Sequence, residues 1–324
     1  MSIFNTMTKI SRKSILFLTA TFAMLYLSIP SITSSINSER VSNDKSVTSN
    51  TSVNWCKELH WRNPPLPFAI ALASYPGSGN TWLRYLLQQA TGIVTGSVSL
   101  DYSLRKRGFP AENISDGSVL VVKTHKYPPK HLRKFESAVL LIRNPRDAIL
   151  AEFNRIISGH TGLAPKSAFE MKVRAPKRIS TQRGSWLPTK QYSNAACTVQ
   201  TLASRTVEDL GRRRYSNVWF PFVSLQLRKW EFFHNLWLTK YPGPVYIVFY
   251  EALLSDTRGT LQGILSFLNI TVTEEDINCA LLNKDGLYKR NKKYKNFDPF
   301  TEDMYRQINK VKTRVYTKII DSTK

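Results

Sequence analysis

Two glycines in the stretch YPGSGNTW, residues 75–82, separate an apolar run from a helical pattern. Glycine allows a tight turn, and the free N–H groups at the start of a helix form a binding site for an anion. The hydroxyl groups of Ser78 and Thr81 are additional donors. The stretch predicts a phosphate-binding loop, with a purely structural turn as the alternative. The predicted phosphate-binding residues are Gly77, Ser78, Gly79, Asn80 and Thr81.

The triplet Lys123-Thr124-His125 ends a second apolar run and carries groups suited to proton transfer. A hydroxyl that attacks as a nucleophile must lose its proton, and a histidine with an unperturbed pKa near ~6.5 can accept it at neutral pH. Lys123 lies two residues earlier on the same side of the strand, where its charge can stabilise a leaving group. We predict His125 and Lys123 as catalytic residues; the alternative for His125 is a histidine with only a structural hydrogen bond.

A third motif, LLIRNPRD, places Arg143 at the end of another apolar run. Arginine suits a phosphate because its planar guanidinium binds two oxygens at once. A basic segment at 284–301 supplies Lys289 and Arg290, which we predict to reach the same phosphate. A solvated run of charge is the alternative for that segment.

The elements that must position these motifs are buried strands alternating with helices. The runs 68–75, 118–125, 137–144 and 244–251 are short and continuously apolar, which is typical of strands buried on both faces. The alternation predicts an α/β fold with a central parallel sheet flanked by helices, whose ligands bind at the carboxyl ends of the strands. Four helical stripes accompany the strands: Trp82, Leu83, Leu86, Leu87 and Ala90; Ile149, Phe153, Ile156 and Ile157, with Pro145 near the helix start; Val223, Leu227, Trp230, Phe233 and Trp237; and Leu261, Ile264, Leu265 and Leu268.

The aromatic stripe from 223 to 237 is predicted to be core rather than a surface that stacks on a cofactor or glycan. Three cysteines, Cys56, Cys197 and Cys279, imply neither a disulfide framework nor a zinc cluster. One bridge can form, and the sequence leaves open whether Cys56 pairs with Cys279 or with Cys197.

The first fifty residues predict the compartment. Three positive residues precede an apolar run, which favours a cytosolic tail (1–13) and one transmembrane signal-anchor helix (14–32), with a cleaved signal peptide as the alternative. Residues 33–54 are rich in Ser, Thr and Asn and predict a flexible stem. The folded body at 55–324 is then lumenal, which suits the sequons at Asn50, Asn113 and Asn269.

The charge balance favours an anionic partner. Lys and Arg number 46 against 23 Asp and Glu, a formal net charge of +23. Such an excess suits nucleic acid, a membrane surface, an acidic glycan or a phosphorylated cofactor, although it can also serve solubility alone. Eleven of the basic residues lie in 163–216 with only three acids, and this segment predicts either a mobile basic insertion or an ordered substrate-gripping element.

These motifs together resemble the sulfotransferase domain of the WSC-domain-containing proteins, which are sialate O-sulfotransferases of the Golgi. The resemblance rests on residues 72–97, on VVKTH, on LLIRNPRDAILAEFNR and on KDGLYKRN, and it covers roughly 68–162 and 219–315. It implies a P-loop NTPase-like sulfotransferase fold with 3′-phosphoadenosine 5′-phosphosulfate (PAPS) as donor and no metal. The loop would hold the 5′-phosphosulfate and Trp82 would lie against the adenine. Arg143, Lys289 and Arg290 would bind the 3′-phosphate.

The chain departs from related patterns at several positions. Cytosolic sulfotransferases carry a lysine at position 77 and adenylate-kinase-like loops carry one at 80, where this chain has Gly77 and Asn80. The glycine form is also the form of the family that it resembles. Without the lysine, Lys123, Arg84 or backbone N–H groups must neutralise the leaving phosphate. The pattern also expects a serine where this chain has Ala151, and the stem leaves no space for a WSC module.

The leading hypothesis is a single-pass Golgi membrane sulfotransferase that acts on a glycan hydroxyl, with sialic acid favoured by the resemblance alone. The alternative is a catalytically inactive lumenal protein that binds acidic or sialylated glycans. A nucleotide kinase lacks its loop lysine and evident magnesium-binding acids. A nucleic-acid partner is not expected, because it would explain the charge but not the anchor.

Overall fold

Strand β1 (Ala69–Ser74) is the central strand of a five-stranded sheet in the order β2-β3-β1-β4-β5. Each neighbouring pair of strands is parallel. The computed structural model describes residues 53–130, 134–170, 218–288 and 297–322. The other strands are β2 (Gly96–Ser97), β3 (Val122–Thr124), β4 (Phe135–Ile142) and β5 (Val245–Phe249).

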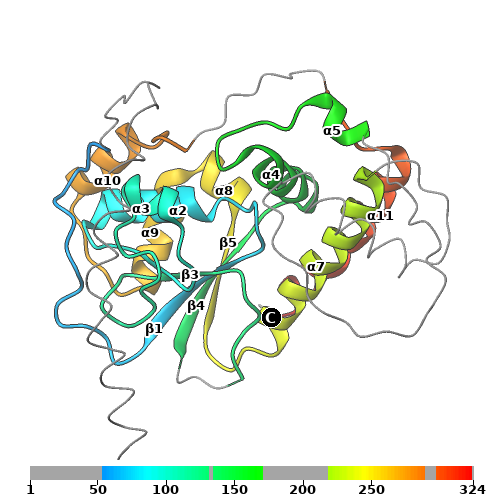
Figure 1. The fold of residues 1–324 in the computed structure, drawn as a ribbon. Coiled ribbons are helices and arrows are strands. Elements are labelled where there is room, and N and C mark those ends of the chain that lie inside the picture. Colours follow the sequence, from blue (N-terminus) through cyan, green and yellow to red (C-terminus); the bar gives the residue numbers. More distant parts are fainter. Residues whose placement is uncertain (1–52, 131–133, 171–217, 289–296, 323–324) are drawn as a thin grey trace, which may run out of the picture. The chain divides into compact units, whose positions relative to one another are not determined.

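Helices cover both faces of this sheet, as Figure 1 shows, with α2, α9 and α10 on one side and α4, α7 and α11 on the other. Alternate residues of β1 divide between two cores, because Ala71 and Ala73 face one set of helices and Leu72 faces the other. The helix bounds are α2 (Asn80–Thr91), α3 (Tyr102–Lys106), α4 (Pro145–Ser158), α5 (Lys166–Glu170), α7 (Trp219–Thr239), α8 (Tyr250–Ser255), α9 (Thr257–Phe267), α10 (Glu274–Leu282) and α11 (Glu302–Ser322).

The predicted α/β fold with a parallel sheet is confirmed. The runs 68–75 and 244–251 contain β1 and β5, and the run 137–144 covers β4 from residue 137 onward although the strand begins at Phe135; only Val122–Thr124 of the run 118–125 is strand. The two-residue strand β2 has no apolar run and was not predicted. All four helical stripes lie on helices, except that Leu268 is the C-cap just after α9; the aromatic stripe of α7 is core, with Trp230 and Trp237 fully buried.

The start of the predicted basic insertion belongs to the core. Helix α5 buries Ala168 and Phe169, and the Phe169 ring lies 4.8 Å from that of Phe153 and 5.0 Å from that of Trp219. Residues 163–170 are therefore ordered by aromatic packing, which a count of charges does not reveal. The rest of that segment, 171–216, lies outside the described residues.

The predicted tail, anchor and most of the stem also lie outside the described residues. Within the described ranges, no helix combines the length and apolar character that a membrane crossing requires.

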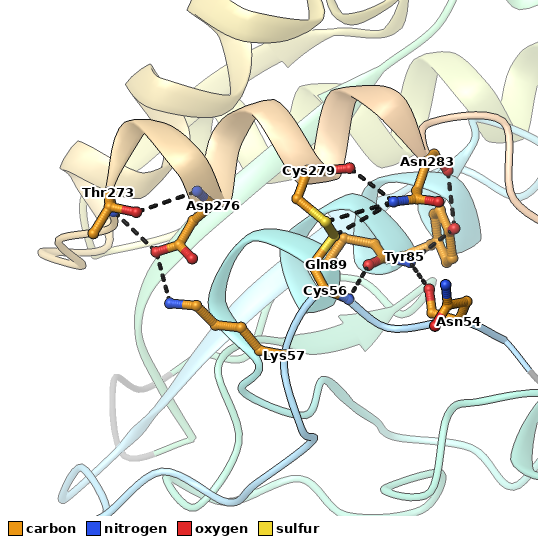
Figure 2. The surroundings of a disulfide bond; sticks show 9 residues. All are labelled: Asn54, Cys56, Lys57, Tyr85, Gln89, Thr273, Asp276, Cys279 and Asn283. Atoms are coloured by element: carbon orange, nitrogen blue, oxygen red, sulfur yellow. Dashed lines mark hydrogen bonds and ion pairs between the residues drawn. A yellow bond between two sulfur atoms is a disulfide. The ribbon is translucent and has the colours of Figure 1, made fainter.

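A disulfide joins Cys56 to Cys279 and resolves the pairing that the sequence left open. Figure 2 shows how this bridge attaches the beginning of the body to α10. Beside it, Lys57 Nζ lies 2.6 Å from Asp276 Oδ2, and the Cys56 N–H donates to Gln89 Oε1 of α2 at 2.8 Å. The N-terminal segment thus fixes α10 against α2.

We expect the Cys56→Ser/Cys279→Ser double variant to lose about 2–5 kcal/mol of unfolding free energy, because the bridge restrains the unfolded chain. Urea denaturation with and without reductant measures the loss. The matched control is Cys197→Ser, which leaves both bridge cysteines in place and should retain the sensitivity to reductant. Equal stability of the double variant and the wild type would show that the bridge contributes nothing.

Candidate active site

The loop between β1 and α2 approaches two other elements so closely that only glycine fits. Gly77 and Gly79 have φ values of +80° and +93°, in the left-handed region that favours glycine. A Cβ atom at Gly77 would lie 2.3 Å from the backbone oxygen of Ala148 in α4, and one at Gly79 would lie 2.6 Å from the ring of Tyr250. A lysine at position 77 therefore has no room, which accounts physically for its absence.

Unpaired donors gather at this loop. The first N–H groups of a helix have no partner within the helix, and no side chain caps the start of α2. Within the described part of the chain, the buried atoms Ser78 Oγ and Arg143 Nε have no hydrogen-bond partner. Buried polar groups are normally satisfied, so these atoms fit a bound anion such as a phosphate.

Arg143 extends from the end of β4 to this loop. Its Nη1 donates to the Gly77 carbonyl at 2.9 Å, and its guanidinium carbon lies 4.2 Å from the centre of the Tyr250 ring. Trp230 Nε1 of α7 donates to the Arg143 carbonyl at 3.2 Å and fixes the backbone there. Arg143, which was predicted to bind a phosphate, is thus held beside the predicted phosphate-binding loop.

Two aromatic rings flank the loop on the α2 side. The half-buried Trp82 donates from Nε1 to the Lys284 carbonyl at 2.7 Å, and its ring meets Tyr250 edge-on at 5.6 Å. Tyr250 directly follows β5 and contacts Gly79, Arg143 and Trp82, yet the sequence analysis did not single it out. An aromatic residue at the carboxyl end of a predicted strand was the available signal.

The remaining loop predictions have different outcomes. The Asn80 side chain points back to β1, donating to the Leu72 carbonyl at 3.1 Å and to Ser74 Oγ at 3.0 Å, so these two donations are used within the fold. Thr81 is half-buried beside Trp82. The other predicted phosphate ligands, Lys289 and Arg290, lie outside the described residues.

His125 is fixed in one tautomer by the neighbouring strand. Its Nδ1 lies 2.7 Å from the Ser74 carbonyl, which can only accept, so Nδ1 carries the hydrogen. Nε2 is therefore unprotonated in the neutral ring and can accept a proton.

Crowding by surrounding protein, followed by the positive charge of Lys123, lowers the pKa of His125 to about 3. The residue is nevertheless exposed to solvent, and water offsets part of that desolvation. A lowered pKa keeps the imidazole neutral at neutral pH.

Lys123 stands beside His125 and is half-buried. Burial, and then the positive charge of Arg84, lower the pKa of Lys123 below its usual value, while the carboxylates of Glu112 and Asp101 act in the opposite direction. Its register partner on β1 is Leu72, so it lies next to the strand that leads into the phosphate loop.

The suggestion that Arg84 replaces the loop lysine is wrong. The side chain is fully buried, with 0% exposure, and its Nη1 lies 2.6 Å from Glu112 Oε1. The other two nitrogens donate to Thr95, at 2.9 Å to the hydroxyl and 2.8 Å to the carbonyl. Arg84 therefore stabilises the fold and is not available to a ligand. Lys123 and the backbone N–H groups of α2 remain as the candidates for neutralising the leaving phosphate.

The fold is that of a parallel α/β protein with a glycine loop between β1 and α2. The chain belongs to the WSCD family. A family member from Aedes aegypti is 38% identical over 289 residues, which is 82% of this chain and 78% of the relative. One from Drosophila pseudoobscura pseudoobscura is 37% identical over 290 residues, which again cover 82% of this chain and 78% of the relative. One from Drosophila melanogaster is 39% identical over 251 residues, which cover 78% of this chain and 66% of the relative.

No protein-family model matches the chain. Among solved structures, similarity is found to a mouse sulfotransferase complexed with PAP, with a TM-score of 0.37, 17% identity and coverage of 77% of this chain and 84% of that one. Retinol dehydratase in complex with androsterone and the inactive cofactor PAP has a TM-score of 0.36 and 17% identity, with coverage of 81% of this chain and 82% of that one. Similarities this low carry no argument about the site.

The close approach at Gly77 predicts that restoring a lysine damages the protein. Gly159 is the matched control, because its φ is also positive, at +76°, but no atom lies within 4 Å of an added Cβ. Gly159→Ala should cost about 1–3 kcal/mol of unfolding free energy from backbone conformation alone. Gly77→Ala and Gly77→Lys should each cost about 1–3 kcal/mol more from overpacking against α4. Chemical denaturation measures all three, and a Gly77→Lys variant as stable as Gly159→Ala would contradict this reading.

Proposed function

We propose that this protein is a sulfotransferase that moves a sulfuryl group from PAPS to a hydroxyl group of a glycan. The observation that carries the proposal is the hydrogen bond from His125 Nδ1 to the Ser74 carbonyl, at the end of the strand that leads into the glycine loop, which leaves Nε2 to accept a proton. A general base and an anion site therefore share one edge of the sheet. The resemblance of the sequence motifs to WSC-domain-containing sulfotransferases supports the same reaction.

The donor's two ends match two groups of residues. The N–H groups at the start of α2, with Ser78 Oγ, would hold the 5′-phosphosulfate. Arg143, whose Nε is unpaired among the described residues, would bind the 3′-phosphate, together with Lys289 and Arg290 from the undescribed segment. The edge-on pair of Trp82 and Tyr250 offers apolar surface for a base.

In the proposed transfer, the acceptor oxygen forms a bond to sulfur while the bond from sulfur to the phosphate oxygen breaks. His125 Nε2 takes the hydroxyl proton as that oxygen attacks. Lys123 and the N–H groups of α2 stabilise the electron pair that remains on the leaving phosphate. The products are a sulfate ester and 3′-phosphoadenosine 5′-phosphate, with one proton released.

We propose an acidic sugar, with sialic acid as the leading candidate, as the acceptor. The charges of Lys123 and Arg155 both act on His125, so the surroundings of the proposed base are positive. Arg155 is held by Glu152, with Nε–Oε2 and Nη2–Oε1 distances of 2.7 Å, and its side chain is 44% exposed. Nη1, the nitrogen of this guanidinium that does not bond Glu152, would donate to a carboxylate on the acceptor.

We also propose a type II location in the Golgi membrane, with the body in the lumen. The Cys56–Cys279 bridge supports a compartment in which disulfides persist. The sequon residues Asn113 and Asn269 are both exposed, as lumenal glycosylation requires.

The second candidate is a catalytically inactive protein that binds acidic glycans. It is favoured by Ala151, which stands where the sulfotransferase pattern has a serine, so the proposed 3′-phosphate site lacks the hydroxyl group of that serine.

Calorimetric titration of the purified full-length protein with 3′-phosphoadenosine 5′-phosphate distinguishes the two candidates. Wild type should bind it, and Arg143→Ala should weaken binding by about tenfold or more through the loss of charge-assisted hydrogen bonds. His125→Ala is the matched control: it should retain nucleotide affinity but lose about 10²–10⁴-fold in transfer rate. A folded wild-type protein without nucleotide binding would favour the inactive candidate.

The lowered pKa of His125 predicts an unusual pH profile. The base must be neutral, so kcat/KM should stay level from about pH 7 down to about pH 5 instead of falling near the normal histidine pKa. Lys123→Gln removes a positive charge that disfavours the imidazolium, so the pKa of His125 should rise and the acid limb should move to higher pH. A limb that stays in place, or moves to lower pH, in Lys123→Gln would contradict the assignment.

A further inference from the structure

A shallow groove of about 390 Å³ lies between the outer side of α7 and the segment that follows His125. It is lined by Tyr127, Arg228, Lys229, Glu231, Phe232 and Asn235. The buried stripe of α7 faces the core, whereas Phe232 is 52% exposed and Tyr127 is 51% exposed. The two rings meet edge-to-face with centroids 5.1 Å apart, so each holds the other in place while leaving apolar surface in water.

The polar groups of the groove leave it positively charged. Glu231 is neutralised by Arg314 of α11, with Nε–Oε1 at 2.8 Å and Nη2–Oε2 at 2.9 Å. Asn235 Oδ1 accepts from Lys318 Nζ at 3.0 Å. Arg228 and Lys229 have no ion-pair partner in the described part of the chain.

Exposed aromatic rings beside uncompensated cations suit an acidic sugar. Ring faces and edges pack against the apolar C–H surface of a sugar, and cations bind its carboxylate or sulfate. A contiguous apolar patch rimmed by polar groups is also what a ligand groove shows on a protein surface.

The groove is close to the proposed base along the chain. Tyr127 follows His125 by two residues, which span at most ~7 Å of extended chain. Trp237 Nε1 of α7 donates to the Lys126 carbonyl at 3.1 Å, so the segment between them is fixed to the helix that forms the groove. A glycan that presents one sugar to His125 can therefore reach the groove with another sugar of the same chain.

We propose that this groove is a second sugar-binding site, which holds an acidic sugar of the same acceptor glycan at a distance from the reacting hydroxyl. The proposal rests on the proposed function for its link to transfer, but binding itself can be measured without turnover. It assigns to Phe232 and Tyr127 the packing of the sugar ring, and to Arg228 and Lys229 the binding of its charge.

The test compares two probes on full-length protein loaded with 3′-phosphoadenosine 5′-phosphate: a single acidic monosaccharide and a tetrasaccharide with an acidic sugar at each end. Titration should show tighter binding of the tetrasaccharide. Phe232→Ala should weaken the tetrasaccharide by about fivefold or more and leave the monosaccharide unchanged, because stacking occurs only at the remote sugar. The matched control is Trp61→Ala, another exposed aromatic at 47%, which should change neither affinity.

Equal wild-type affinity for the two probes would overturn the proposal. This result is expected if another chain segment or a protein partner occupies the groove. So would a Phe232→Ala variant with unchanged tetrasaccharide binding. Nucleotide binding is measured separately on the same variants, so its absence would count against the proposed transferase activity and leave the sugar-binding result standing.

Discussion

The double pairing of β1 is the constraint on which the candidate site depends. Ala73 is in register with Thr124 of β3, and Ser74 is in register with Leu141 of β4. Because all three strands run parallel, the phosphate loop, His125 and Arg143 emerge from one edge of the sheet. The hydrogen bonds from His125 to the Ser74 carbonyl and from Arg143 to the Gly77 carbonyl then fix their side chains on that edge. The separation between the proposed base and the glycine loop is thus set by sheet geometry.

Close backbone packing takes the place of a charged side chain in the loop. The oxygen of Ala148 occupies the space that a residue with a Cβ would need at Gly77, and the Tyr250 ring does the same at Gly79. The loop therefore offers N–H groups and the Ser78 hydroxyl as donors, with Arg143 beside it and Lys123 on the adjacent strand. Positive charge is placed around the loop by neighbouring strands.

The sequence predicted the parts of this arrangement that depend on local pattern. Continuously apolar runs identified the three long strands, and the motifs at their ends identified the edge where His125, Arg143 and the loop meet. The sequence of α11 also has a helical period, although no helix was predicted there; its members, all buried, are Met304, Ile308, Val311, Val315 and Ile319.

Contacts between distant residues could not be predicted in that way. Arg84 reads as an ordinary polar position on α2, yet its partner Glu112 lies 28 residues away and both side chains are fully buried. The aromatic cluster that orders α5 joins residues from three separate segments. Burial and pairing of this kind are properties of the assembled chain, because no local period encodes which elements meet.

The Cys56–Cys279 bridge has a consequence for the order of biosynthesis. The two cysteines are separated by 223 residues, and at ~5–20 residues per second the second follows the first by roughly 10–45 s. Cys197 is synthesised in between, so the first thiol that Cys56 can meet is not its native partner. A premature bridge of that kind must be exchanged through attack by a thiolate before the native bond forms. Formation of the native bridge therefore coincides with the packing of α10 against α2. Native disulfide formation is thus a late step in the maturation of this protein.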